Sequence, residues 1–422
     1  MKEHECALTV NFNSANGNES ASRYADIQTV ASTQNGSPSS KMKVVKSTNQ
    51  TEGTMRDYNG KTVYVGIDVH KKTYSCVSIC NNEVVKRDSM PAKPEIILTY
   101  LNNAFKGAKI ESVYEAGFSG FQLHRFLVSN GIHNRVVNAA SIEISSRDRV
   151  KTDKRDALKM STQLSVGRLK GIHVPDENRE EMRSVTRLRA TMIKLRNQVG
   201  NQFKSLLFTQ GLIAVEDDTV ISEKWIKGKI IEIKEKKFSG DFIFTVEQYQ
   251  DQWLQLHNRV KEITKRMKLQ AKQEQGLQDI YESVPGIGPI HARQLINELG
   301  DMKQFKNERR LFSFTGLTPC EYSSGENIRQ GNISRQGNAM LRKILVEAAW
   351  VAIYKDPDLK ETFDRIAHRR GKKRAIVAIA RRLVGRIRSC VLSGSLYEKK
   401  LIKEACSLQN GLHDPAAVAV MS

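Results

Sequence analysis

Cysteine and long apolar runs are scarce in this chain of 422 residues. Six cysteines are too few for a disulfide framework, and Cys76 and Cys80, the only close pair, have a spacing that does not suit a zinc knuckle on a strand. No apolar run approaches the roughly 18 residues that a membrane span needs, and the N-terminus has no hydrophobic signal core. These absences predict a protein of the reducing cytoplasm with no membrane partner.

Acidic side chains are also few relative to basic ones. Lys and Arg number 67 against 46 Asp and Glu, which gives a formal net charge of +21 and a pI near 9.7. An excess of this size indicates a polyanionic partner, and nucleic acid is expected before a membrane surface. We therefore expect a protein that binds nucleic acid.

Composition divides the chain into five segments. Residues 1–60 are rich in Ser, Asn, Thr and Gly and are predicted to be a disordered extension. An α/β domain is expected over 61–170 and a helical coiled-coil or linker region over 171–276. A mostly α domain is expected over 277–395, and a tail over 396–422.

The α/β domain is predicted from alternating β-rich and amphipathic segments. The Asn81-Asn82 pair predicts a hairpin turn between two of the strands, and Pro94 opens a helix. Three antiparallel strands followed by alternating α and β segments are typical of a layered α/β fold. In order, the expected elements are strands at 62–69, 73–80 and 83–88, a helix at 94–105, a strand at 110–115, a helix at 119–129, a strand at 132–137 and helical segments around 139–166.

Two apolar stripes with alternating spacings of three and four residues run through the middle region. One extends from Val185 to Leu206 and the other from Trp253 to Met267. Such stripes predict an antiparallel coiled-coil hairpin or a dimer seam, and core packing alone explains them equally well. The connecting stretch at about 210–245 is charged, and we predict that it is irregular.

The third region opens with a glycine-rich turn and ends in a basic segment. Gly286 and Gly288 lie between two helical patterns, as in a helix-hairpin-helix element, and are expected to free backbone N–H groups for a phosphate. A plain helix-joining turn would have the same sequence. The segment 369–388 predicts one helix whose basic face is expected to bind phosphate, with a solvated face as the alternative. That face includes Lys372, Lys373 and Arg374.

Four carboxylates occupy positions typical of a metal centre. Asp68 ends the first strand and Glu115 ends the fourth, which puts both at one sheet edge if these strands are parallel neighbours. Asp153 and Asp156 are three residues apart at the start of a helix and turn toward one face. Converging carboxylates repel one another unless divalent cations neutralise them, and Mg²⁺ or Mn²⁺ suits such oxygen ligands. A turn residue at Asp68 and helix caps at the other two aspartates are the structural alternatives.

A polar stretch at 320–338, CEYSSGENIRQGNISRQGN, has almost no apolar residue and lies between helical segments. Loops of this kind carry function more often than packing. A serine hydroxyl there could attack a metal-polarised phosphate, with Arg329, Arg335 and Arg342 as cationic neighbours. A loop that only touches DNA phosphates would have the same composition.

The motifs YVGIDVHKK, VYEAG and KTDKRDA, followed by VPGIGP and GLTPCEYSSGENIRQGNISRQGNAMLRK, resemble the DEDD transposases of the insertion-sequence 110 and 1111 type. The resemblance covers roughly 61–395, so that the N-terminal extension is not part of the family pattern. It implies a coiled-coil middle and a C-terminal transposase domain. It also implies an RNase-H-like (RuvC-like) N-terminal domain that carries Asp68, Glu115, Asp153 and Asp156.

The same resemblance implies a serine nucleophile in the YSSG stretch, which we assign to Ser323 with Ser324 as the alternative. It further implies a structured guide RNA from the mobile element. Family members are similar to one another in assembling as dimers of dimers, so a homo-oligomer is expected.

These features together predict a recombinase that cuts and rejoins DNA to move its own insertion sequence. A transient phosphoserine link would conserve bond energy, so that cutting and rejoining need no ATP. Two alternatives remain open: a metal-dependent, structure-selective nuclease of the Holliday-junction resolvase type, which needs no serine, and an inactive nucleic-acid-binding relic.

Overall fold

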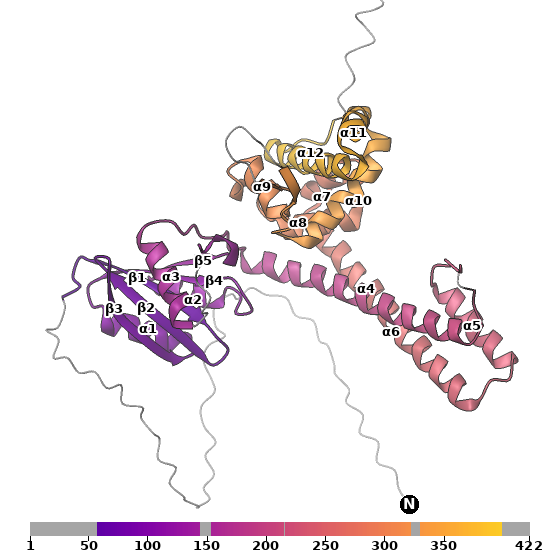
Figure 1. Cartoon of the computed structure of the whole chain (residues 1–422), viewed down its shortest axis with the longest axis horizontal. Coiled ribbons are helices and arrows are strands. Elements are labelled where there is room, and N and C mark those ends of the chain that lie inside the picture. The colour runs from indigo at the N-terminus through magenta and orange to yellow at the C-terminus, as the bar shows by residue number, and fades with distance from the viewer. Residues whose placement is uncertain (1–56, 144–152, 215, 322–329, 399–422) are drawn as a thin grey trace, which may run out of the picture. The chain divides into compact units, whose positions relative to one another are not determined.

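A computed structural model describes residues 57–143, 153–214, 216–321 and 330–398 (Figure 1). Most of the predicted N-terminal extension, the serines of the YSSG stretch, Arg329 and most of the C-terminal tail lie outside these ranges. Over the described part of the chain, an α/β unit is followed by mostly helical structure.

The N-terminal unit contains a five-stranded sheet with the strand order β3-β2-β1-β4-β5. The strands β1 (Thr62–Val69), β2 (Thr73–Cys80) and β3 (Glu83–Pro91) are antiparallel neighbours, whereas β4 (Lys109–Glu115) and β5 (His133–Val137) run parallel to β1. Asn81 and Asn82 have φ angles of 51° and 64°, which is the left-handed backbone of a tight hairpin turn. The predicted order of strands and this turn are therefore confirmed.

Helices pack on both faces of the sheet. On one face, α1 (Pro94–Ala104) and α2 (Gln122–Ser129) contribute Ile97, Leu101, Leu123 and Leu127 to a core shared with Val63, Val65 and Ile67 of β1. On the other face, α3 (Asp153–Ser165) packs Met160 and Leu164 against Val113 and Val137. A short 3₁₀ turn, η1 (Ala139–Ser141), follows β5.

Two long antiparallel helices form the middle of the chain, α4 (Glu177–Thr209) and α6 (Gly240–Gln273), and Figure 1 shows them side by side. Their direction follows from the contacts of Arg189 with Thr264 and of Arg196 with His257. Leu188 and Leu195 of the predicted apolar stripe are 47% and 39% exposed, although Val199 is buried. The helix pair is thus present, whereas the coiled-coil seam stays a prediction.

The prediction that 210–245 is irregular is wrong. This stretch contains α5 (Glu223–Glu235), which begins after Ser222, whose side chain accepts a hydrogen bond from the Trp225 amide. Ile226, Ile230 and Ile233 are buried against the two long helices. Their helical spacing was hidden by the charged residues between them.

The C-terminal unit is a helical bundle with one small hairpin. Its elements are α7 (Gln275–Glu282), α8 (Pro289–Leu299), η2 (Met302–Gln304), α9 (Glu308–Thr315), β6 (Pro319–Glu321), β7 (Gln330–Ile333), α10 (Ala339–Lys355), α11 (Pro357–Arg370) and α12 (Lys372–Ser393). The strands β6 and β7 pair antiparallel, and a single apolar core joins the helices. None of the helices that the structure describes is long and apolar enough to cross a membrane.

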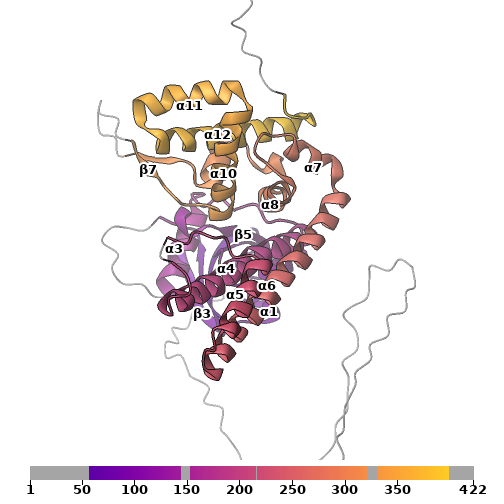
Figure 2. The same cartoon turned by 90° about the vertical axis from the view of Figure 1, so that its right-hand side faces the viewer.

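The predicted continuous basic helix over 369–388 is also wrong. Gly371, with a φ of 81°, ends α11 and starts α12, so the segment is divided between two helices that run side by side (Figure 2). A glycine tolerates this left-handed backbone without steric cost, which is why the chain can reverse there.

Candidate active site

The first two predicted carboxylates lie on neighbouring parallel strands. Ile67 of β1 pairs with Tyr114 of β4, so Asp68 and Glu115 follow in adjacent positions at the carboxyl ends of these strands. This is the sheet edge at which open α/β folds gather their sites. The predicted parallel arrangement is confirmed.

Gly66 brings the helix α3 to the same edge. A β-carbon at Gly66 would lie only 2.1 Å from the carbonyl oxygen of Ala157 and 2.7 Å from the amide nitrogen of Ser161. The helix backbone therefore rests directly on β1, because position 66 has no side chain. Asp153 precedes Ala157 by about one helical turn, and Asp68 follows Gly66 by two residues on the same strand face.

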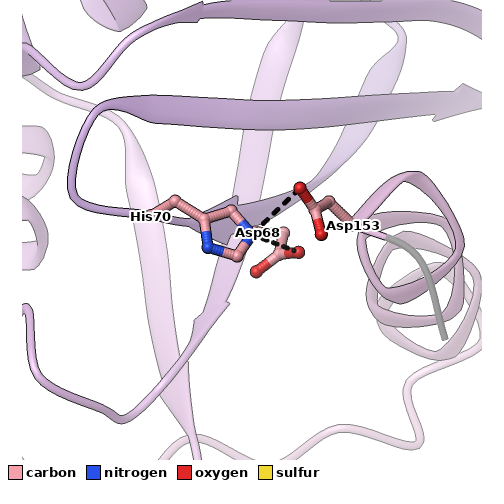
Figure 3. Close-up of side chains that lie close together, drawn as sticks. All are labelled: Asp68, His70 and Asp153. Atoms are coloured by element: carbon pink, nitrogen blue, oxygen red, sulfur yellow. Dashed lines mark hydrogen bonds and ion pairs between the residues drawn. The ribbon is translucent and has the colours of Figure 1, made fainter.

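Asp68 and Asp153 converge on a histidine that sequence reasoning missed. The Nε2 atom of His70 lies 3.3 Å from Oδ2 of Asp68 and 3.2 Å from Oδ2 of Asp153 (Figure 3). The side chains of these three residues are 21%, 45% and 57% exposed, in chain order, so the group is open to solvent and to a ligand. The available sequence signal was the Asp-x-His spacing, which places both side chains on one face of the strand end.

The other two predicted carboxylates are near this group without being part of it. Among the residues that the structure describes, the ligand atoms of Asp68, His70 and Asp153 lie within 4.8 Å of one another, and neither Glu115 nor Asp156 joins them. The Oδ1 atom of Asp156 is 3.4 Å from Nζ of Lys159. The structure therefore brings two of the four predicted carboxylates together and leaves the other two at the margin.

The electrostatics of the group favour a cation. Burial raises the pKa of Asp68 above its ordinary value, and the negative charges of Asp153 and Asp156 raise it further, whereas the charge interaction and the hydrogen bond with His70 act in the opposite direction. A raised carboxyl pKa means that the ionised form lacks compensating positive charge. Two carboxylate oxygens and an imidazole nitrogen at an exposed edge fit a divalent cation that also keeps water or phosphate ligands.

The hairpin that carries the predicted nucleophile has a tightly packed neck. Ser323 and Ser324 lie outside the described residues. The neck, which we define as the segments 314–316 and 335–342 on either side of the hairpin, is described. A β-carbon at Gly337 would lie 2.5 Å from the carbonyl oxygen of Phe314, and the amide of Asn338 donates to that same oxygen at 3.0 Å. The chain segments before and after the hairpin are thus held against each other.

Arg342 is part of this neck. Its Nη1 atom is 3.5 Å from the carbonyl oxygen of Thr315 and 3.4 Å from that of Arg335, and the side chain is half-buried. Arg335 is exposed and has a φ of 55°. Arg342 consequently has structural contacts of its own, and its predicted role at nucleic acid stays a prediction, as does that of Arg335.

The remaining predicted contacts to nucleic acid lie on the C-terminal bundle. Lys372, Lys373 and Arg374 are exposed in the first turn of α12, where the helix dipole disfavours cations unless an anion is bound nearby. Gly286, with a φ of 85°, would place a β-carbon 2.3 Å from the carbonyl oxygen of Ala348, so packing against α10 explains this glycine without a ligand. Gly288 is exposed at the N-cap of α8.

A mixed sheet with carboxylates at the ends of β1 and β4 and at the start of α3, followed by a mostly helical region, is consistent with the RNase-H-like DEDD transposases. A family model described as "Transposase", for DEDD transposases of the IS110 type, matches residues 65–209. A second model, described as "Transposase IS116/IS110/IS902 family", matches residues 278–364. The chain belongs to this family of insertion-sequence transposases.

Individual relatives agree with this membership. The chain is 28% identical over 253 residues to the protein y4qE of Sinorhizobium fredii, a match that covers 58% of this chain and 60% of y4qE. It is 25% identical over 363 residues to the transposase for insertion sequence element IS1533 of Leptospira borgpetersenii, covering 81% of this chain and 99% of that protein. It is 23% identical over 276 residues to the transposase for insertion sequence element IS1111A of Coxiella burnetii, a match that covers 64% of this chain and 74% of that protein.

Proposed function

We propose that this transposase cuts and rejoins DNA by means of a divalent metal centre at Asp68 and Asp153 and a serine nucleophile at Ser323. The observation that carries the proposal is the convergence of two carboxylates from β1 and α3 on one cation-sized position, in a chain of the IS110-type family. We assign Glu115 and Asp156 to the margin of the same centre, where they would hold a further cation or its water ligands.

The carboxylates would bind and orient the metal, with Mg²⁺ or Mn²⁺ as the expected ions. When bound, the cation supplies positive charge to the non-bridging oxygens of the scissile phosphate. Asp68, near the end of β1, is the less exposed of the two carboxylates and would fix the position of the centre. Asp153 is more exposed and would face the incoming strand.

Ser323 would act on the phosphate so positioned, with Ser324 tuning its orientation. In the first step, the bond from serine Oγ to phosphorus forms, one DNA ester bond to that phosphorus breaks, the serine proton is released, and the departing DNA oxygen takes up a proton. A DNA hydroxyl then attacks the phosphoserine in the reverse sense and restores the serine. The number of phosphoester bonds is unchanged, so no ATP is required.

The partners in this proposal are DNA, a guide RNA encoded by the element, and further copies of the chain. The excess of basic residues supports a polyanionic partner, and the exposed cations at the start of α12 would contact its phosphates. Arg329, Arg335, Gly286 and Gly288 are proposed as additional contacts. The dimer of dimers and an action at the cytoplasmic nucleoid are inferred from the family.

The test is denaturing electrophoresis of labelled target DNA incubated with the protein, divalent metal and the element's RNA, before and after protease digestion. We expect a protease-sensitive covalent adduct with the parent protein and with Ser324→Ala, and none with Ser323→Ala. An adduct from Ser323→Ala but not from Ser324→Ala would move the nucleophile by one residue. Efficient cleavage by the double alanine variant would replace the serine mechanism with a metal-activated water, as in the resolvase-type nucleases.

A further inference from the structure

His70 is held in place by the turn that joins β1 to β2. Its backbone amide donates to the carbonyl oxygen of Thr73 at 2.9 Å, which closes the turn next to the last residue of β1. His70 and Asp68 are two positions apart in an extended segment, so their side chains leave the chain on the same side. The imidazole is thereby placed beside the carboxylate by the backbone itself (Figure 3).

The spacing of the three side chains is that of ligands around one ion. Neighbouring corners of an octahedron with bonds of about 2.2 Å lie about 3.1 Å apart. The separations from His70 Nε2 to the Oδ2 atoms of Asp68 and Asp153 are 3.3 Å and 3.2 Å. Because the ligand atoms of all three residues lie within 4.8 Å of one another, a single cation between them could contact all three.

We propose that His70 is the third protein ligand of the metal centre, through Nε2, and that this nitrogen makes the centre prefer Mn²⁺ to Mg²⁺. The inference rests on the proposed function and specifies which ion that function uses. It goes beyond an all-carboxylate centre, because a nitrogen ligand changes which metal is bound most tightly.

Ligand chemistry gives the direction of the preference. Mg²⁺ binds oxygen almost exclusively and keeps several waters, whereas imidazole is a common ligand of first-row transition metals. Two carboxylates alone would serve Mg²⁺ and Mn²⁺ similarly. Coordination requires the lone pair of Nε2, so that the ring hydrogen resides on Nδ1 in the loaded protein.

A different role is available to the same atoms. If Nε2 keeps its hydrogen when metal is present, His70 would only donate a hydrogen bond to a carboxylate and would orient the ligand from outside the coordination sphere. Both roles make His70 important for activity, so a loss of cleavage does not separate them. The test must report on a bond between the metal and nitrogen.

Pulsed electron paramagnetic resonance of Mn²⁺ provides this readout, because a directly coordinated imidazole gives a ¹⁴N coupling to the metal. The experiment uses the metal-stripped full chain with one equivalent of Mn²⁺, and compares the parent with His70→Ala. The matched control is His133→Ala, since His133 is an exposed histidine on β5 of the same sheet. We expect the ¹⁴N coupling in the parent and in His133→Ala, and its loss in His70→Ala.

Titration calorimetry with Mn²⁺ and with Mg²⁺ tests the preference. We expect His70→Ala to lower the Mn²⁺ affinity at least about tenfold and the Mg²⁺ affinity by less than about threefold, with the native fold verified by circular dichroism. Bound Mn²⁺ without a ¹⁴N coupling in the parent, or equal losses for both ions, would overturn the proposal and leave the carboxylate centre standing. A Mn²⁺ affinity that does not change in Asp153→Asn would instead overturn the metal centre of the proposed function.

Discussion

The carbonyl oxygen of Ala157 occupies the space where Gly66 would carry a side chain, and this contact sets the distance between β1 and α3. Both Asp68 and Asp153 are positioned by it, although neither residue takes part in the contact. The close approach of strand and helix thus determines whether the two carboxylates can share an ion.

Gly66→Ala should accordingly damage the site from within the core. The added methyl group would lie 2.1 Å from the Ala157 oxygen, so α3 must move away from β1. We expect a loss of about 1–3 kcal/mol in the free energy of unfolding, as for other overpacked cores, together with weaker Mn²⁺ binding. Chemical denaturation and calorimetry measure the two effects.

Gly228→Ala is the matched control. Gly228 lies inside α5, and a β-carbon there would meet no atom within 4 Å beyond its neighbouring residues and the backbone of its own helix. The substitution should leave metal binding unchanged and stabilise the protein by up to about 1 kcal/mol, because alanine is the better helix former. If Gly66→Ala behaves like Gly228→Ala, the close approach does not position the site.

Asp153→Asn and Glu115→Gln should each abolish strand cleavage without harming the metal-free fold. Loss of one negative charge weakens divalent binding. At Asp153 it also relieves repulsion around Asp68, whose pKa is raised by burial and by the charges of Asp153 and Asp156. The melting temperature without metal should therefore hold or rise slightly, and the rise on adding Mn²⁺ should shrink. Metal-free variants that melt well below the parent would identify these residues as structural.

Glu298→Gln should destabilise the C-terminal unit strongly. Glu298 of α8 is almost fully buried and accepts hydrogen bonds from Arg187 Nε at 2.8 Å, Arg183 Nη2 at 3.3 Å and Asn338 Nδ2 at 2.7 Å. Neutralising it leaves the mostly buried Arg183 without its anion, whereas Arg187 is 56% exposed and can be solvated, so we expect a loss of about 1–3 kcal/mol in the free energy of unfolding. Urea unfolding measures the change, and Glu347→Gln, at an exposed ion pair, should shift stability by no more than about 1 kcal/mol.

Glu298 should also contribute to the loss of stability at acid pH. Burial tends to raise the pKa of Glu298, but the hydrogen bond from Arg187 and the charges of Arg183 and Arg187 outweigh it, so the net pKa is lowered. A carboxyl group whose pKa is lower in the folded than in the unfolded state stabilises the folded state at pH values above the ordinary pKa of about 4.3. This stability is lost as the pH falls through the pKa of the folded state. Stability measured from pH 6 downward should decline less steeply in Glu298→Gln, and parallel curves would contradict the assignment.

Neutralising Lys372, Lys373 and Arg374 together should weaken nucleic-acid binding in a salt-dependent way. Each lost phosphate contact on duplex DNA should flatten the slope of log affinity against log salt by about 0.9. The control replaces Lys227 of α5 and Lys236 at its C-cap, which pair with Glu223 and Glu232 of the same helix. An unchanged slope in the triple variant would show that the start of α12 is a solvated surface that does not bind phosphate.

Local patterns predicted the sheet well, but they missed the helix α5 and the division of the basic segment at Gly371. The strands at 62–69 and 73–80 and the Asn81-Asn82 turn are as expected, because alternation and turn chemistry are local properties. The break between α11 and α12 at Gly371 was missed because the basic residues on both sides of the glycine suggested one continuous helix. The order of Asp68 and Glu115 along the chain predicted that both lie at one sheet edge, and the parallel pairing of β1 with β4 places them there.

What could not be predicted depends on contacts between distant residues. His70 stands in a run of basic residues that suggests a solvated turn, and its partner Asp153 is brought near only by the packing of α3 on Gly66. Glu298 looked like an ordinary helix residue, yet its charge is balanced by arginines from α4. Neither the contact of His70 with Asp153 nor that of Glu298 with the arginines of α4 produces a recognisable pattern in the sequence.

The buried carboxylate of Glu298 also joins two parts of the chain that are far apart in the sequence. Arg183 and Arg187 belong to the long helix α4, whereas Asn338 caps α10 and follows directly on the neck of the serine hairpin. One buried carboxylate therefore joins α4 to the residue that follows the hairpin neck. Removal of its charge is expected to loosen the helix contact and the base of the hairpin together.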